Sequence, residues 1–183
     1  FFEKMPISQL TNTAGCPPFT VCHGSPFRVN ESLRYDFDYI DELTKKLPTQ
    51  LTVCGHSHIR ADYTRNGKRV INPGSVGVSL RTDGGKALFM ILHGSEEGWS
   101  PEFLSLEYDV EKAIEDMDRE KLYLKAPCWY KITKHIIKDG GDDSFVAVLT
   151  RANKIYFEET GISIWQDIPE RCWEKALWEI LRI

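Results

Sequence analysis

Short apolar segments that end beside glycine and histidine dominate the first third of the chain. Phe19 to Cys22 and Leu51 to Cys54 have the length and composition of buried strands, and both stop where glycine allows a sharp change of direction. Between them, apolar positions repeat with helical spacing from Asp36 until Pro48, at Phe37, Ile40, Leu43 and Leu47. This order predicts a β-α-β crossover with parallel strands, whose C-terminal ends share one edge of a sheet.

A second, antiparallel layer is expected downstream. Two strand-like segments, Ile59 to Thr64 and Lys68 to Ile71, flank Arg65-Asn66-Gly67, and Asn-Gly is a strong signal for a tight hairpin. The sequence Asn72-Pro73-Gly74-Ser75 then predicts a rigid loop. Two more strands are predicted at Ala87 to Leu92 and Glu102 to Tyr108. The fold class is therefore α/β.

The pattern becomes helical beyond residue 108. Asp109 is a suitable N-cap for a first helix, and Pro127 and Pro169 are placed to open two others. Between these prolines, Phe145, Leu149, Ala152 and Tyr156 share a helical face. We predict two domains, an α/β domain at residues 1–108 and an acidic helical extension at residues 109–183.

Composition narrows the class of protein. The chain has 183 residues, with 42% hydrophobic side chains, and no apolar segment approaches the roughly 20 residues that cross a bilayer. Five scattered cysteines without a Cys-x-x-Cys pair favour reduced thiols, and we expect a cytoplasmic protein without a membrane partner. The net charge of −4 lies mostly after residue 100, and no basic stripe indicates a nucleic-acid partner.

Three histidines at the predicted strand ends are the candidate metal ligands. His23 follows the first strand, and His56 and His58 follow the second, so the crossover should bring them together. Imidazole suits Zn, Mn, Fe and Co. An alternative adds Cys22 and Cys54 to form a structural zinc site, but adjacent strand residues such as Cys22 and His23 point to opposite faces. We therefore interpret both cysteines as buried strand residues, and His93 and His135 as structural or exposed.

These motifs together resemble a known family. They are His23-Gly24-Ser25-Pro26 with Asn30-Glu31, then Gly55-His56-Ser57-His58, then Asn72-Pro73-Gly74-Ser75-Val76-Gly77. In this order they resemble the second half of the calcineurin-like metallophosphoesterases, in particular the small bacterial phosphodiesterase branch. The resemblance covers roughly residues 1–110. It implies part of a two-sheet α/β sandwich, followed here by the helical extension.

The resemblance also implies a chemistry. His23 and His56 would bind the second of two divalent metal ions and His58 the first, with Mn preferred and Fe, Zn or Ni as alternatives. The turn from Asn72 to Gly77 would shape the site rather than ligate. The substrate would be a small phosphate ester, hydrolysed by a hydroxide that the two metal ions activate. No substrate-binding residue is assigned, since Arg60 and Arg81 fit phosphate contacts and ordinary surface positions alike.

The acidic half of the family pattern is missing from the sequence. Asp-x-His, Gly-Asp-x-x-Asp and Gly-Asn-His do not occur at the expected places, and the chain begins with Phe1. We expect an N-terminally truncated piece of a metal-dependent phosphoesterase that has no catalytic residue of its own and is inactive alone. Exposed strand edges would favour association with the missing N-terminal half or with a second chain.

A non-enzymatic scaffold with the same fold is the alternative function. In that case the helical extension would offer a sticky aromatic surface through Trp165, Trp173 and Trp178. A scaffold would not require the three histidines, so their presence favours the enzyme hypothesis. The coding sequence upstream of Phe1 would separate the enzyme hypothesis from the scaffold hypothesis, since only an enzyme requires the acidic motifs in that region.

Overall fold

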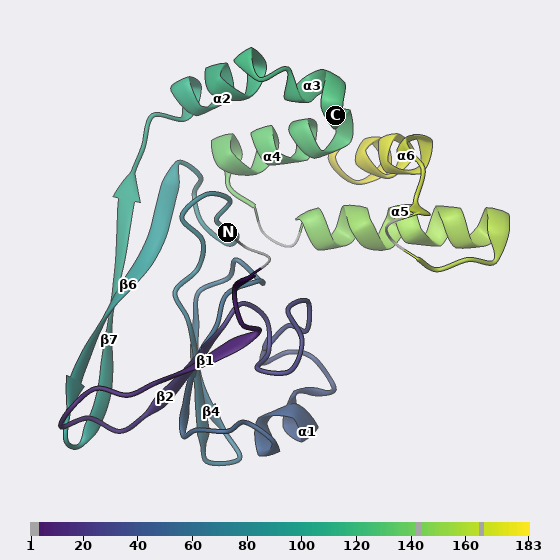
Figure 1. The fold of residues 1–183 in the computed structure, drawn as a ribbon. Coiled ribbons are helices and arrows are strands. Elements are labelled where there is room, and N and C mark those ends of the chain that lie inside the picture. The colour runs from purple at the N-terminus through teal and green to yellow at the C-terminus, as the bar shows by residue number, and fades with distance from the viewer. Residues whose placement is uncertain (1–3, 142–143, 165–166) are drawn as a thin grey trace. The chain divides into compact units, whose positions relative to one another are not determined.

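The structure is a computed structural model that describes residues 4–141, 144–164 and 167–183 (Figure 1). Residue contacts divide the chain into two compact units. The first, here called the sheet unit, comprises Phe1–Val76 and Ala87–Leu106, and the second, the helical unit, comprises Gly77–Lys86 and Glu107–Ile183. The domain boundary between residues 108 and 109 stays a prediction. Residues 77–86 belong to the helical unit although they precede two strands.

The sheet unit contains one five-stranded sheet and a two-stranded sheet. The first five strands are β1 (Ser8–Thr11), β2 (Phe19–Cys22), β3 (Leu51–Val53), β4 (Ala61–Arg65) and β5 (Lys68–Asn72), arranged in the order β1-β2-β3-β5-β4. The second sheet pairs β6 (Lys86–Ser95) with β7 (Gly98–Glu107). Strands β2, β3 and β5 run parallel, whereas β1 and β4 are antiparallel to their neighbours. The mixed α/β class is as predicted.

The β-α-β crossover is confirmed. Helix α1 (Ile40–Lys45) connects β2 and β3, which pair in parallel with Thr20 opposite Thr52. The helix is shorter than the predicted span, which began at Asp36, and no side chain caps it at Tyr39.

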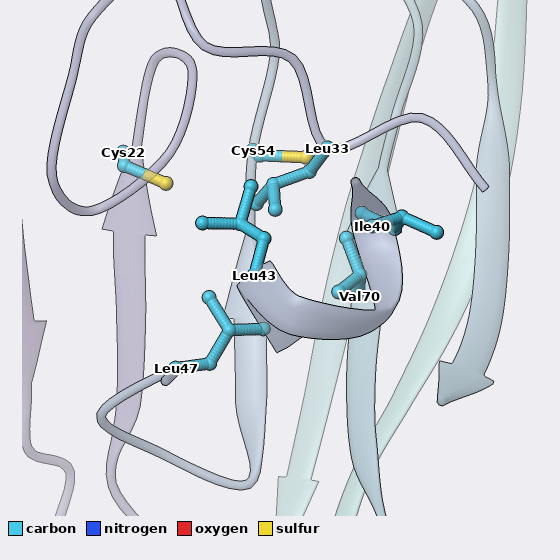
Figure 2. Close-up of a cluster of buried hydrophobic side chains, with 7 residues drawn as sticks. All are labelled: Cys22, Leu33, Ile40, Leu43, Leu47, Cys54 and Val70. Carbon is cyan, nitrogen blue, oxygen red and sulfur yellow. The ribbon is translucent and has the colours of Figure 1, made fainter. Parts of the chain in front are cut away.

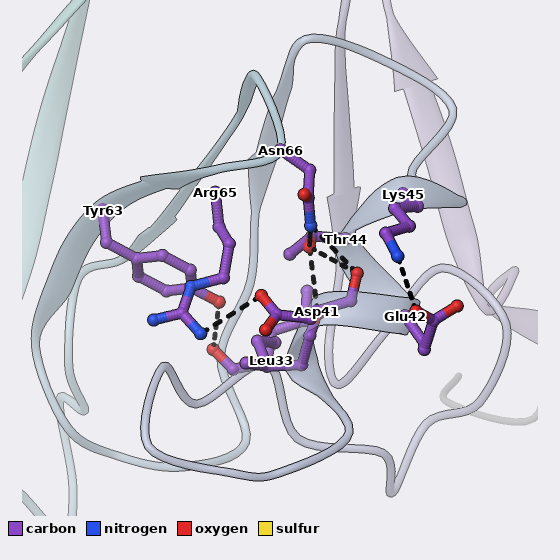
Figure 3. Close-up of polar contacts among 9 residues, drawn as sticks. Leu33, Asp41, Glu42, Thr44, Lys45, Tyr63, Arg65 and Asn66 are labelled. Carbon is purple, nitrogen blue, oxygen red and sulfur yellow. Dashed lines mark hydrogen bonds and ion pairs between the residues drawn. The ribbon is translucent and has the colours of Figure 1, made fainter.

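The Asn66-Gly67 hairpin is also confirmed. Arg65 pairs with Lys68 across a two-residue turn, in which both central residues have positive φ, 52° and 71°. This is the geometry for which Asn-Gly is preferred. Figure 3 shows the turn fastened to α1, since Nδ2 of Asn66 donates to the carbonyl of Asp41 at 3.0 Å and to Oγ1 of Thr44 at 2.9 Å.

One cluster of buried side chains packs α1 against the parallel strands (Figure 2). Its members are Cys22, Leu33, Ile40, Leu43, Leu47, Cys54 and Val70, with Tyr63 partly buried against them. Tyr63 also donates its hydroxyl to the carbonyl of Leu33 at 3.0 Å (Figure 3). The packing of α1 thus holds the ends of β2 and β3, which the candidate ligands follow.

The described residues of the helical unit form five helices. They are α2 (Val110–Arg119), α3 (Leu122–Lys125), α4 (Pro127–Asp139), α5 (Ser144–Thr160) and α6 (Glu170–Leu181). The predicted caps are present, since Asp109 accepts a hydrogen bond from the backbone of Lys112 and Pro127 opens α4. The predicted inward face of α5 is wrong in part. Its buried positions are Ser144, Val148, Ala152 and Ile155, whereas Phe145 is exposed.

No helix in the described parts of the chain has both the length and the apolarity needed to cross a membrane.

Candidate metal site

The ends of the two parallel strands bring two of the predicted ligands together. The ring centroids of His23 and His56 are 5.2 Å apart, with the rings inclined at 72°. The backbone between them is tied as well, because the amide of Gly55 donates to the carbonyl of His23 at 2.8 Å. His23 is exposed and its neighbour Cys22 is buried, as the alternation of a strand requires. The two strand ends therefore present a pair of imidazoles at one edge of the sheet.

The loop with the other histidines has an unusual backbone. His56 and His58 have φ values of 65° and 58°, in the left-handed region that side chains other than glycine rarely occupy. Each such residue costs about 1 kcal/mol or more relative to a right-handed conformation. Two of them within three positions require support from neighbouring groups. This support comes from β5.

Asn72, at the end of β5, provides that support. Its side-chain amide donates to the carbonyl of Gly55 at 2.7 Å and to Oγ of Ser57 at 3.0 Å. Its Oδ1 accepts the backbone amide of Gly74 at 2.9 Å, which closes the turn after the strand. Asn72 is 3% exposed, so these bonds are shielded from water. The turn thus shapes the histidine loop.

The loop after His23 is closed by a buried serine. Ser25 is fully buried, and its hydroxyl donates to the Glu31 carboxylate at 2.5 Å while accepting the amides of Phe27 and Arg28. Gly24 is in close contact with the far side of this loop, where a Cβ would lie 2.5 Å from the carbonyl oxygen of Val29. The motif His-Gly-Ser-Pro with Glu31 is therefore a compact, self-bonded loop. The sequence indicated its members as a motif but not these roles.

The environment of His56 favours the neutral imidazole. Burial lowers its pKa from the usual value, and the neighbouring His23 and His58 lower the pKa further, because like charges at short range disfavour protonation. A neutral ring is the form that binds a metal ion. The electrostatics of this loop are thus compatible with ligand function.

The donors of this chain do not make up a complete metal site. Within the described residues there is no group of three or more His, Cys, Asp or Glu side chains placed to hold one ion. The His23 and His56 pair fits as part of a site, since borderline divalent metals accept imidazole. A pair of neutral donors supplies no anion to balance a divalent charge. The described residues thus bring together two imidazole ligands and no acidic ligand.

The cysteines beside the histidines are buried, as predicted. Cys22 is 9% exposed and Cys54 4%, and burial raises the pKa of the Cys22 thiol to about 12 and that of Cys54 further. Sγ of Cys22 donates to the carbonyl of Gly24 at 3.2 Å. A zinc ligand must be a thiolate. Protonated, buried thiols disfavour the structural zinc alternative.

The raised pKa of Cys22 predicts a loss of stability at alkaline pH. Between the ordinary thiol pKa of 9.0 and about 12, the unfolded chain releases a proton that the folded chain retains. The free energy of unfolding should therefore fall as the pH rises, by up to about 1.4 kcal/mol per pH unit for this group. Urea titrations of wild type and Cys22→Ala at pH 8, 9 and 10 measure the slope. Equal slopes in the two proteins would contradict the prediction.

The remaining candidates lie elsewhere. Arg60 is a structural residue, since its guanidinium donates to the carbonyl of Leu104 at 2.5 Å and lies over the Phe103 ring. Arg81 is in the helical unit, with its amide bonded to the carbonyl of Gly141. His93 contacts Glu102 at 2.8 Å, and His135 contacts Asp139 at 3.2 Å within α4. Both histidines thus contact a carboxylate away from the candidate site.

The mixed α/β fold thus places paired histidines at the ends of two parallel strands. A model of the calcineurin-like phosphoesterase superfamily domain matches residues 1–97, and the chain belongs to this family. No curated protein matches the sequence at a significant level.

Solved structures show the same fold. A hypothetical protein from Pyrococcus horikoshii OT3 has a TM-score of 0.59 and 20% identity, over 76% of this chain and 52% of that one. A metallophosphoesterase from Sphaerobacter thermophilus has a TM-score of 0.52 and 19% identity, over 65% of this chain and 55% of that one. This chain thus spans about half the length of either structure. The likeness to the Pyrococcus protein extends past the residues that the family model matches.

Proposed function

We propose that this chain is the histidine-bearing half of a metal-dependent phosphoesterase. His23 and His56 would hold one divalent ion and His58 a second, with Mn preferred and Fe, Zn or Ni as alternatives. Bound there, such ions supply a water of lowered pKa and neutralise charge on phosphoryl oxygens. This chain does not supply the acidic ligands that such a site needs, so a further segment or a second chain would have to supply them. The substrate class is a small phosphodiester.

The imidazole pair is the observation that supports this proposal. His23 and His56 face one another at 5.2 Å on tied strand ends, and His58 belongs to the same strained loop. A buried asparagine holds this loop in a conformation that glycine would adopt without strain. Family membership is consistent with this chemistry.

The incomplete donor set supports the proposal that this chain needs acidic ligands from elsewhere. Three neutral imidazoles leave the charge of two divalent ions uncompensated, so the 183 residues alone bind metal weakly and do not turn over substrate. Activity would require association with the remaining part of the domain, in the same polypeptide or as a second chain.

The test compares this chain with the full product of its reading frame. Each is assayed with bis(p-nitrophenyl) phosphate and MnCl₂. We expect background rates from the 183 residues, and hydrolysis by the full product that falls by roughly a hundredfold or more in His56→Ala. His93→Ala serves as the matched control, because that histidine is in the β6-β7 sheet and pairs with Glu102. Substantial turnover by the 183 residues, or an active His56→Ala enzyme, would refute the proposal.

A scaffold remains the second candidate, favoured by one observation on α6. Trp178 is 59% exposed, an uncommon position for so large an apolar side chain. Trp173 does not contribute in the same way, since it is half-buried and donates its indole N–H to the carbonyl of Ile168. Trp165 lies outside the described residues. If Trp178→Ala abolishes self-association or partner capture while the phosphoesterase assays stay at background, the scaffold is preferred.

A further inference from the structure

Asn30 and Glu31 belong to the first sequence motif, but the proposed function gives neither of them a role. They lie at the far end of the loop that follows His23. This loop begins at the end of β2, where the carbonyl of His23 accepts the amide of Gly55 at 2.8 Å. The loop therefore starts beside the strand end that precedes His56.

The returning end of the loop contacts the His56 ring. The backbone carbonyl of Asn30 accepts a hydrogen bond from this half-buried imidazole. A neutral imidazole carries one proton, so the nitrogen that donates to Asn30 holds the N–H and the other nitrogen keeps its lone pair. That second nitrogen is the one available to a metal ion. A carbonyl in this place therefore favours one tautomer of the ring.

Glu31, the residue after Asn30, is held by both its side chain and its backbone. Its carboxylate accepts the hydroxyl of Ser25 at 2.5 Å, and its amide donates to the carbonyl of Arg28 at 3.4 Å. Ser25 has no exposed surface, and its own amide donates to the same Arg28 carbonyl at 3.0 Å. The chain just after Asn30 is thus fastened to the base of the loop.

The bond to Glu31 uses the whole donor capacity of the Ser25 side chain. The hydroxyl carries one proton, which goes to the carboxylate, while its oxygen accepts the amides of Phe27 and Arg28 at 3.1 Å each. A hydroxyl bond to a carboxylate is roughly twice as strong as a bond between neutral groups. Without the carboxylate, this buried hydroxyl would lose its acceptor, and the two sides of the loop would separate there.

The chain just before Asn30 is held by packing. Gly24 lies so close to Val29 that a Cβ would be 2.5 Å from its carbonyl oxygen and 2.8 Å from its carbonyl carbon. Asn30 therefore has a backbone contact on one side and the Glu31 bond on the other. Of the two, only the bond between Ser25 and Glu31 is a side-chain pair that a single substitution can remove or preserve.

We propose that Glu31 is a positioning residue for His56. Its bond to Ser25 holds the Asn30 carbonyl against the imidazole, and the carbonyl fixes the tautomer whose free nitrogen can bind a metal ion. Histidine ligands are commonly oriented by such a partner on the other ring nitrogen. All of these groups lie in the sheet unit. The value for metal binding rests on the proposed function, whereas the fixed tautomer is a property of the metal-free chain.

The experiment observes the tautomer of His56 directly. The full chain is labelled with ¹⁵N-histidine, and the ring nitrogens are assigned by their chemical shifts and couplings to the ring protons, without metal at pH 8. We expect one tautomer in the wild type and a mixture of both in Glu31→Ala and Ser25→Ala. Glu31→Gln should retain the wild-type tautomer, because its amide oxygen can still accept the Ser25 hydroxyl.

Glu102→Ala is the matched control, because it removes a carboxylate that contacts another histidine, His93, at 2.8 Å in the same unit. It should shift the His93 signals and leave those of His56 unchanged. A mixture of tautomers in the wild type would overturn the proposal without any variant, so the test does not depend on the folding of Glu31→Ala. A single tautomer in folded Glu31→Ala, or an equal loss in Glu31→Gln, would overturn it as well.

Mn²⁺ binding by the full product of the reading frame is measured separately. We expect Glu31→Ala to weaken binding by roughly tenfold or more, and Glu31→Gln to restore most of that loss. Equal Mn²⁺ affinity in Glu31→Ala and the wild type would overturn the role of Glu31 in metal binding. If the wild-type product binds no Mn²⁺, the proposed function fails, while the tautomer measurement still decides whether Glu31 positions His56.

Discussion

Gly24→Ala should destabilise the sheet unit by about 3 kcal/mol, because the new methyl group would overlap backbone atoms that cannot rotate away. The Cβ would lie 2.5 Å from the carbonyl oxygen of Val29 and 2.8 Å from that of Arg28. Relief requires moving the Arg28 carbonyl, which accepts the amides of Ser25 at 3.0 Å and Glu31 at 3.4 Å. The loop after His23 would then open. Urea unfolding followed by fluorescence measures the loss.

Gly55→Ala is the matched control for this prediction. It lies in the same candidate site, but its Cβ would be 3.5 Å from the carbonyl oxygen of His23, an ordinary van der Waals distance. Neither Gly24 nor Gly55 has a positive φ, so the two substitutions differ in available space and not in backbone strain. We expect Gly55→Ala to change the free energy of unfolding by less than about 1 kcal/mol. Equal unfolding midpoints for the two variants would show that the close approach is unimportant.

The sequence was sufficient to predict the elements whose signals are local. The β2-α1-β3 crossover follows from compact apolar segments around a helical repeat, and the β4-β5 hairpin follows from Asn66-Gly67. Asp109 and Pro127 were likewise identified as helix starts from capping chemistry alone. In each case a short stretch of residues determines the conformation without help from distant segments.

Elements that depend on long-range contacts were not predictable. Strand β1 (Ser8–Thr11) has no apolar alternation, and it forms because β2 offers an edge. Residues 77–86 have the composition of a Gly-rich loop, and only the approach of Gly140 explains why position 84 is glycine. Such features require knowledge of which segment lies opposite.

In the candidate site too, only the features with local signals could be predicted from the sequence. The positions of His23 and His56 at neighbouring strand ends follow from the crossover. The left-handed conformation of His56 and His58 does not, because imidazole side chains carry no local preference strong enough to predict it. That conformation depends on Asn72, fourteen positions or more along the chain, whose role as a hydrogen-bond donor became evident only from the distances.

Asn72→Ala should therefore remove the support of the histidine loop and cost about 3 kcal/mol. The substitution deletes donors to Gly55 and Ser57 and the acceptor for Gly74, and it leaves a partly buried carbonyl and a partly buried amide without these partners. The strained loop then relaxes, because right-handed conformations are more favourable for His56 and His58. Urea titration measures the free energy, and backbone ¹³C chemical shifts report the change in φ.

Two comparison variants make this prediction specific. Asn153→Ala removes an exposed amide that bonds Ser163 at 3.0 Å in the helical unit, and it should cost less than about 0.5 kcal/mol. Asn72→Asp keeps an oxygen for the amide of Gly74 but turns another oxygen toward the carbonyl of Gly55, so it should be as damaging as alanine at neutral pH. A protonated carboxyl group can donate to that carbonyl, so lowering the pH should restore part of the stability of Asn72→Asp and none of that of Asn72→Ala. If His56 and His58 kept their left-handed φ values in Asn72→Ala, the asparagine would not be what holds the loop.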